Sequence, residues 1–121
     1  REPSEKYNAY WHVTEEALLK VQTTVMKSGS RFLLVMIPDK IQIDTHYWQL
    51  WKQKYNLTDA EINMMAPNRR LKEIAALNKI EFLDPTPEFK KYHEQGAKLY
   101  WKLDHHLRSE GNRAIADALA D

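Results

Sequence analysis

The 121-residue chain contains no cysteine, only 3 glycines and 5 prolines, and no long apolar run. The lack of cysteine excludes disulfides, zinc–thiolate sites and thiol nucleophiles, and it leaves the redox compartment undetermined. Scarce glycine and proline, with 43% hydrophobic and 29% charged residues, argue against a disordered or low-complexity chain. The longest apolar run, residues 32–37, is far shorter than the roughly 20 residues that span a bilayer, so we expect no membrane span.

An excess of charge of one sign is also lacking. The sequence has 18 Lys+Arg and 17 Asp+Glu, and its formal net charge is only +1. Because the two signs are interspersed, there is no basic field of the kind that binds a phosphate backbone, and we expect no nucleic-acid partner. The length suits one domain covering residues 1–121. The first residues lack a signal-peptide core and an initiator methionine, so we interpret the start as a processing or truncation boundary.

Two neighbouring segments near the N-terminus have the patterns of a helix followed by a strand. Thr14 is a suitable N-cap and Gly29 a suitable stop, and apolar residues recur at helical spacing between them, which predicts a helix from about 15 to 28. The run RFLLVMIP that follows is apolar without alternation. Such a run is typical of a strand buried on both faces, so we predict a strand at 32–37 in a parallel sheet covered by helices.

The rest of the chain continues this alternation of helix and strand. The expected elements are a helix beginning near Tyr47, a short helix at 57–65, a helix beginning at Pro67, a strand in the segment IEFLDP, and a helix at 110–120 capped by Ser109. Residues 86–101 carry no clear pattern because a glycine interrupts them. The order of elements predicts an α/β fold with parallel strands joined by right-handed crossovers.

The segment LDHHL precedes the last predicted helix and holds the clearest chemical pattern. In an extended loop, residues two apart point to the same side, so Asp104 and His106 would face one way and His105 the other. A carboxylate can then hold one nitrogen of an imidazole while the second nitrogen meets a hydroxyl. Asp104 and His106 are therefore the candidate pair, although on spacing alone a solvated polar loop is the commoner explanation of such a triplet.

The longer stretch LYWKLDHHLRSEGNRAIADAL resembles the last conserved block of the SGNH hydrolases, the GDSL-like esterases and acyltransferases. The upstream segments FLLVMIPDKIQID and PNRRLKEIAALNKIEFLDPTPEF are similar to strands and helices of the same family, so the resemblance extends from about Trp11 to the C-terminus. It implies a three-layer α/β/α sandwich with a parallel, flavodoxin-like sheet. It also implies that Asp104 is the orienting acid, that His106 is the general base, and that Gly111 begins the last helix.

The nucleophile of that family is not recognisable in this chain. The family's serine lies in an N-terminal Gly-Asp-Ser block, and its oxyanion donors are a glycine and an asparagine in two further blocks, none of which is present. The available serines are Ser4, Ser28, Ser30 and Ser109, and none follows a Gly-Asp pair. Turn chemistry accounts for Ser28 and Ser30, and a helix cap for Ser109. We therefore expect the C-terminal half of an SGNH-type domain, inactive alone, whose missing N-terminal segment carries the serine.

The activity implied by the resemblance is that of a serine esterase or O-acyltransferase. Its substrate would be a small-molecule or carbohydrate ester, including acetyl groups on carbohydrate, and it would need no cofactor. The sequence leaves the compartment undetermined, and an extracytoplasmic location is only an expectation. A metal is not expected, since no pair among Asp44, His46, His93 and His105 has a recognisable ligand spacing.

Two further groups of residues could contact a substrate. Asp39 and Lys40 follow the predicted strand directly, at the edge where α/β sheets bind ligands. Trp48 and Trp51 belong to an aromatic cluster that either packs a helix on the sheet or forms the wall of a cleft for an acyl or sugar group.

One alternative of a different class stays open at this point. The chain could be a non-catalytic α/β module that binds a protein or a carbohydrate through the surface of Trp48 and Trp51. In either case a truncated sheet would leave an unpaired edge or an apolar face, so we also expect a homodimer or strand exchange.

Overall fold

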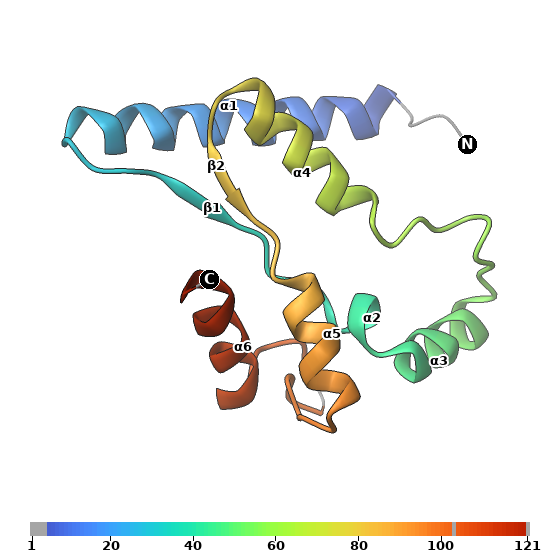
Figure 1. Cartoon of the computed structure of the whole chain (residues 1–121). Coiled ribbons are helices and arrows are strands. Elements are labelled where there is room, and N and C mark those ends of the chain that lie inside the picture. Colours follow the sequence, from blue (N-terminus) through green and yellow to red (C-terminus); the bar gives the residue numbers. More distant parts are fainter. Residues whose placement is uncertain (1–4, 103, 121) are drawn as a thin grey trace.

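The computed structural model describes residues 5–102 and 104–120 of the chain (Figure 1). Ser4, and Leu103 at the start of the segment LDHHL, lie outside these ranges. The elements in chain order are α1 (Glu5–Lys27), β1 (Leu33–Val35), α2 (Lys40–Ile43), α3 (Thr45–Tyr55), α4 (Ala66–Leu77), β2 (Glu81–Leu83), α5 (Thr86–Glu94) and α6 (Ser109–Ala120). The helices that were expected near Tyr47, from Pro67 and at the C-terminus are therefore present. None of the described helices is long and apolar enough to cross a membrane.

The two strands pair in parallel, with Leu34 opposite Phe82, which confirms the prediction of parallel strands and agrees with an α/β fold. The predicted six-residue strand at 32–37 is only three residues long, however. Its ladder ends where the backbone N–H of Met36 donates to the carbonyl of Leu83 at 3.0 Å. Pro38 follows β1 and Pro85 follows β2. Because proline has no N–H to donate, the ladder cannot continue.

The apolar run that forms β1 is not buried on both faces, which corrects the expectation from its pattern. Leu33 and Ile37 are exposed, and Leu34, Val35 and Met36 are half-buried. The reason is that only two strands pair among the described residues, and that α4 packs mainly against β2. A layer of helices on each face of the sheet is therefore not established by these elements.

Helix α1 begins well before residue 14, although a start at about 15 was predicted. Thr14 is not its N-cap: it lies inside the helix, where its hydroxyl donates to the carbonyl of Tyr10 at 3.0 Å. Contacts one turn apart stabilise this first half, such as the edge-on rings of Tyr7 and Trp11 at 6.0 Å. No residue of α1 is buried, and the predicted start was too late because Thr14, followed by two glutamates, has the pattern of a helix N-terminus.

The short helix expected at 57–65 is absent, and this prediction is wrong. Residues 58–61 form a single turn in which the backbone N–H of Glu61 donates to the carbonyl of Thr58 at 3.1 Å. The Glu61 carboxylate in turn accepts from the backbone N–H of Thr58 at 3.0 Å and from its hydroxyl at 2.8 Å. Thr58, a capping residue type at the start of this segment, is therefore satisfied within one closed turn.

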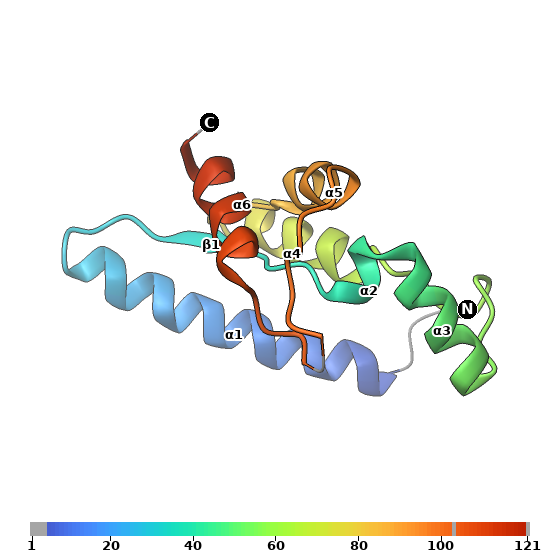
Figure 2. The same cartoon turned by 90° about the horizontal axis from the view of Figure 1, so that it is seen from below.

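A buried core cluster lies between α2, α5, α6 and the segment 97–100. Figure 2 shows α5 and α6 on the same side of the strands, with α2 close to α5. The residues of this cluster are Ile43, Phe89, Leu99, Tyr100 and Ala114, and Ile74, Ala75 and Ile80 are buried next to β2. This core supports the segment that leads into the loop of Asp104 and His106, so the position of that loop depends on the packing of the helices.

Candidate functional site

The site begins at the carboxyl end of β1, where Asp39 starts helix α2. One carboxylate oxygen of Asp39 accepts the backbone N–H of Ile41 at 2.9 Å, and the backbone N–H of Asp39 donates to Gln42 Oε1 at 2.7 Å. These two bonds form a capping box, which fixes both the backbone and one oxygen of Asp39. The second carboxylate oxygen, Oδ2, stays available for a contact outside the helix.

The loop with the Asp-x-His pattern is held at its base by backbone hydrogen bonds. Tyr100 and Leu107 form an antiparallel bridge, and the backbone N–H of Trp101 donates to the carbonyl of His106 at 3.0 Å. The buried Tyr100 hydroxyl donates to the carbonyl of Pro38 at 2.7 Å. Burial, with a smaller effect from the Asp39 charge, raises the pKa of Tyr100 and keeps its hydroxyl protonated. The loop is thus fixed beside the carboxyl end of β1.

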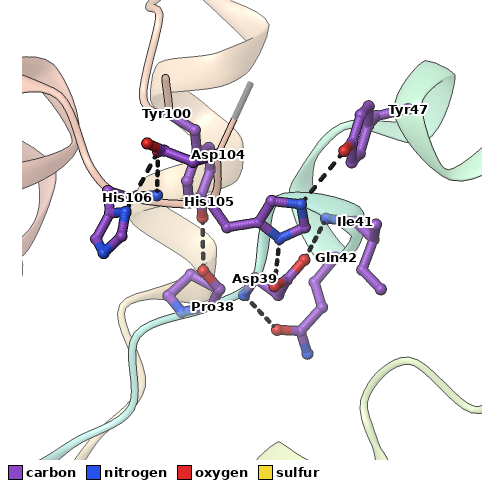
Figure 3. A network of polar contacts seen from close by, with 9 residues as sticks. All are labelled: Pro38, Asp39, Ile41, Gln42, Tyr47, Tyr100, Asp104, His105 and His106. Carbon is purple, nitrogen blue, oxygen red and sulfur yellow. Dashed lines mark hydrogen bonds and ion pairs between the residues drawn. The ribbon is translucent and has the colours of Figure 1, made fainter. Parts of the chain in front are cut away.

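The structure brings Asp104 and His106 together, as the spacing predicted. Asp104 Oδ1 accepts the backbone N–H of His106 at 2.9 Å and lies 3.4 Å from His106 Nδ1 (Figure 3). The second ring nitrogen points away from Asp104. Both side chains are open to solvent, at 88% exposure for His106 and 56% for Asp104. The pair is therefore oriented by its own turn, and His106 Nε2 is accessible from outside.

The spacing argument favoured His106 over His105, yet the ring of His105 has a partner at each of its two nitrogens. Its Nδ1 lies 2.8 Å from Asp39 Oδ2, and its Nε2 lies 3.2 Å from the hydroxyl of Tyr47 (Figure 3). The rings of Tyr47 and His105 meet edge-on with centroids 5.7 Å apart, and Lys40 Nζ lies 4.3 Å above the Tyr47 ring. The partners come from α2 and α3, more than 50 residues away in sequence, so no local spacing could have identified them.

A pocket of about 350 Å³ lies next to this cluster, against α2 and α5. Basic groups dominate its lining, and its charged and titratable members are Lys40, Asp44, His93, Lys98, Tyr100, Lys102 and Arg108. The sequence predicted Asp39 and Lys40 at the carboxyl end of the first strand. In the structure Lys40 lines the pocket and Asp39 contacts His105.

The two candidate tryptophans make contacts within α3 and the turn after it. Trp48 Nε1 donates to Asp59 Oδ1 at 3.0 Å, and Lys52 Nζ lies 2.8 Å from the other oxygen of that carboxylate. Hydrogen bonds from Lys52 and then Trp48 lower the pKa of Asp59. Trp51 packs on Tyr55 at 4.8 Å between ring centroids. Both tryptophans are half-buried, and neither is among the residues that line the pocket.

The described serines lie in turns or at a helix start. Ser28 donates to the carbonyl of Val25 at 2.6 Å and is 3.2 Å from the hydroxyl of Ser30, both at the end of α1. Ser109 is the first residue of α6. Across residues 5–102 and 104–120, no group of three or more histidine and acidic side chains is arranged to hold a metal ion.

Gly111 allows α6 to approach the base of the loop closely. A Cβ at this position would lie 2.5 Å from the carbonyl oxygen of Leu99 and 3.0 Å from Cδ2 of Leu107. The first contact is with backbone, so it cannot be relieved by rotating a side chain. The glycine is thus required by packing, at the position that the resemblance assigned to it.

We expect Gly111→Ala to lower the free energy of unfolding by about 1–3 kcal/mol, the usual cost of overpacking. Alanine by itself would favour the helix by up to about 1 kcal/mol, so a net loss shows that the contact outweighs propensity. Urea denaturation of the chain measures the change. Asn112→Ala, one residue further along α6 and exposed, is the matched control. Equal stability of the two variants would contradict the close approach.

Comparison with known protein families matches nearly the whole chain. A family model described as SGNH hydrolase-like domain, acetyltransferase AlgX, matches residues 2–121. No curated protein and no solved structure matches the chain. The matched range includes both strands, the site at the end of β1 and the loop of Asp104 and His106.

Proposed function

This chain belongs to the SGNH hydrolase-like domain family of the acetyltransferase AlgX, and we propose that it supplies the orienting acid and the general base of a serine-dependent acyl transfer. In this proposal His106 is the base and Asp104 orients it. The observation that carries the proposal is that Asp104 Oδ1 lies 3.4 Å from His106 Nδ1 while the other ring nitrogen faces outward. A base arranged in this way can accept the proton of a hydroxyl that approaches from solvent or from another segment.

The proposed reaction proceeds in two halves. His106 Nε2 takes the proton of a serine hydroxyl while the serine oxygen attacks the acyl carbon, and the ester bond breaks as His106 returns that proton to the leaving alcohol. A water molecule or a second hydroxyl then attacks the acyl-serine, again through His106. Water as acceptor makes the protein an esterase, and a hydroxyl makes it an O-acyltransferase. Ester-linked acetyl groups on carbohydrate are the substrate class that we propose.

The serine and the oxyanion donors are proposed to lie on polypeptide outside these 121 residues. Support comes from the exposure of His106, at 88%, and from the local bonds that occupy the hydroxyls of Ser28 and Ser30. The same polypeptide would complete a three-layer α/β/α sandwich by covering apolar strand residues such as Leu33 and Ile37, which are exposed here. A homodimer is the alternative cover, and a monomer in size-exclusion chromatography at high concentration would argue against it.

The first test separates this chain from a longer one. The 121-residue chain is expected to show no serine-dependent turnover of 4-nitrophenyl acetate and no labelling by a fluorophosphonate, because none of the described serines, Ser28, Ser30 and Ser109, is paired with a base. The polypeptide extended by the sequence that flanks it in its gene is expected to show both. Turnover by the short chain that is lost in Ser109→Ala would place the nucleophile inside it. An extended polypeptide without a fluorophosphonate-reactive serine would contradict the proposed function.

A further inference from the structure

We infer that His105 is a positioning residue, which ties the loop of Asp104 and His106 to the carboxyl end of β1 through Asp39 and Tyr47. The inference rests on the proposed function, since it assigns His105 a role in holding the base of that reaction. Its geometry is a chain of two contacts, from Asp39 Oδ2 to His105 Nδ1 at 2.8 Å and from His105 Nε2 to the Tyr47 hydroxyl at 3.2 Å. Both ring nitrogens of His105 are thus engaged, whereas one nitrogen of His106 is free of these partners (Figure 3).

The anchor on the β1 side is itself held by a polar network that reaches into the interior. The Gln42 side chain accepts the backbone N–H of Asp39, and its Nε2 donates to Asn68 Oδ1 at 2.7 Å. Asn68, only 4% exposed, donates to Asp84 Oδ2 at 2.8 Å and to the hydroxyl of Thr86 at 3.1 Å. Buried polar groups that are fully hydrogen-bonded in this way are held in one arrangement. Asp39 therefore offers the loop a rigid attachment point.

The backbone bonds of the loop hold its base, and the bond from the His106 N–H to Asp104 Oδ1 orients the pair within its turn without tying that turn to the rest of the fold. Backbone bonds connect Trp101 to His106 and Arg108 to Leu99, while the side chains of Asp104 and His106 face solvent. A catalytic base must be held to within about half an ångström of its working position by groups that are themselves fixed. The His105 contacts are the side-chain bonds at the loop tip that reach another part of the fold. They can therefore set the direction in which its neighbour His106 is presented.

The contacts require a specific proton arrangement on neutral His105. Asp39 Oδ2 is a carboxylate oxygen and can only accept, so Nδ1 must carry the proton, and Nε2 must accept from the Tyr47 hydroxyl. A histidine in free solution prefers the opposite tautomer, with the proton on Nε2. The Nδ1–H form of His105 is therefore a signature of this anchor, and it is independent of any catalytic activity.

The tautomer is measured by long-range ¹H–¹⁵N correlation spectra of the full chain at about pH 8.5, two units above the ordinary histidine pKa of about 6.5. We expect the Nδ1–H form at His105. Asp39→Asn keeps the helix cap but presents an amide N–H₂, so it is expected to switch His105 to the Nε2–H form. Tyr47→Phe should change the ¹⁵N chemical shift of His105 Nε2. Tyr55→Phe, on the same helix, is the matched control and should leave that shift unchanged. An Nε2–H tautomer in the unmodified chain would overturn the anchor.

A second measurement tests positioning rather than mere contact. His105→Ala is expected to speed hydrogen exchange of the His106 backbone amide, which donates to Asp104, by about tenfold. The exposed His46 on α3 provides the control variant His46→Ala. Unchanged exchange in His105→Ala would overturn the positioning role even if the tautomer is as expected. Neither the tautomer spectrum nor the hydrogen-exchange rate depends on acyl-transfer activity. Failure of the anchor and failure of the proposed function are therefore distinguishable.

Discussion

His106→Ala is expected to lower kcat/KM for an acetyl ester by about four orders of magnitude or more in the extended, serine-containing polypeptide. The imidazole is the group that would take the serine proton and return it to the leaving alcohol, and alanine can do neither. The expected loss is large because removing the base of a serine–histidine pair costs nearly as much as removing the nucleophile. The measurement is hydrolysis of 4-nitrophenyl acetate, with labelling by a fluorophosphonate as a second readout.

Two companion variants make the result specific. Asp104→Asn keeps a side chain that can accept the His106 backbone N–H but removes the charge next to Nδ1, so its effect should be smaller than that of His106→Ala. His12→Ala on α1 removes an exposed imidazole that only faces Glu16, so it should leave activity unchanged. If His106→Ala keeps more than a tenth of the activity, His106 is not the base.

Phe89→Ala is expected to lower the free energy of unfolding by about 3–5 kcal/mol. Phe89 is fully buried on α5, and it packs in the core with Leu99 and Tyr100, which lead into the loop of Asp104 and His106. Alanine would leave a cavity at the centre of the only buried cluster that supports the loop among the described residues. Because domains of this size are stable by only about 5–15 kcal/mol, the loss is a large part of the total.

Urea denaturation followed by tryptophan fluorescence measures this loss, and an unchanged m-value would show that unfolding stays two-state. Leu77→Ala, at a leucine that is 77% exposed at the end of α4, is the matched control. It should change the free energy of unfolding by no more than about 0.5 kcal/mol. A loss below about 1 kcal/mol in Phe89→Ala would contradict the placement of the core between α2, α5 and α6.

Elements with strong local signals could be predicted from sequence. Ser109 and a clear apolar stripe marked α6, Pro67 marked the first turn of α4, and Pro38 and Pro85 marked the ends of the two strands. Each of these signals acts within a few residues, through capping, periodicity or a missing backbone donor. The parallel pairing followed from the order of the elements, because a helix between two strands returns the chain in the same direction.

Burial was predicted less well, because it depends on elements that are distant in sequence. The apolar run at 32–37 has the pattern of a strand covered on both faces, yet β1 pairs with one neighbour and its residues are exposed or half-buried. The first half of α1 has no buried face, and contacts one turn apart stabilise it. The apolar pattern of a segment indicates the burial with which it is compatible. Its actual burial depends on which other elements pack against it.

For the site, sequence by itself determined the pair of Asp104 and His106, because two residues in one short turn meet through local geometry alone. It also placed Asp39 and Lys40 at the end of a strand, where ligands bind. Only the tertiary structure decided that His105 joins Asp39 and Tyr47, 66 and 58 residues away. The physical reason is that these contacts form only when the packing of Phe89, Leu99 and Tyr100 carries the loop to the carboxyl end of β1.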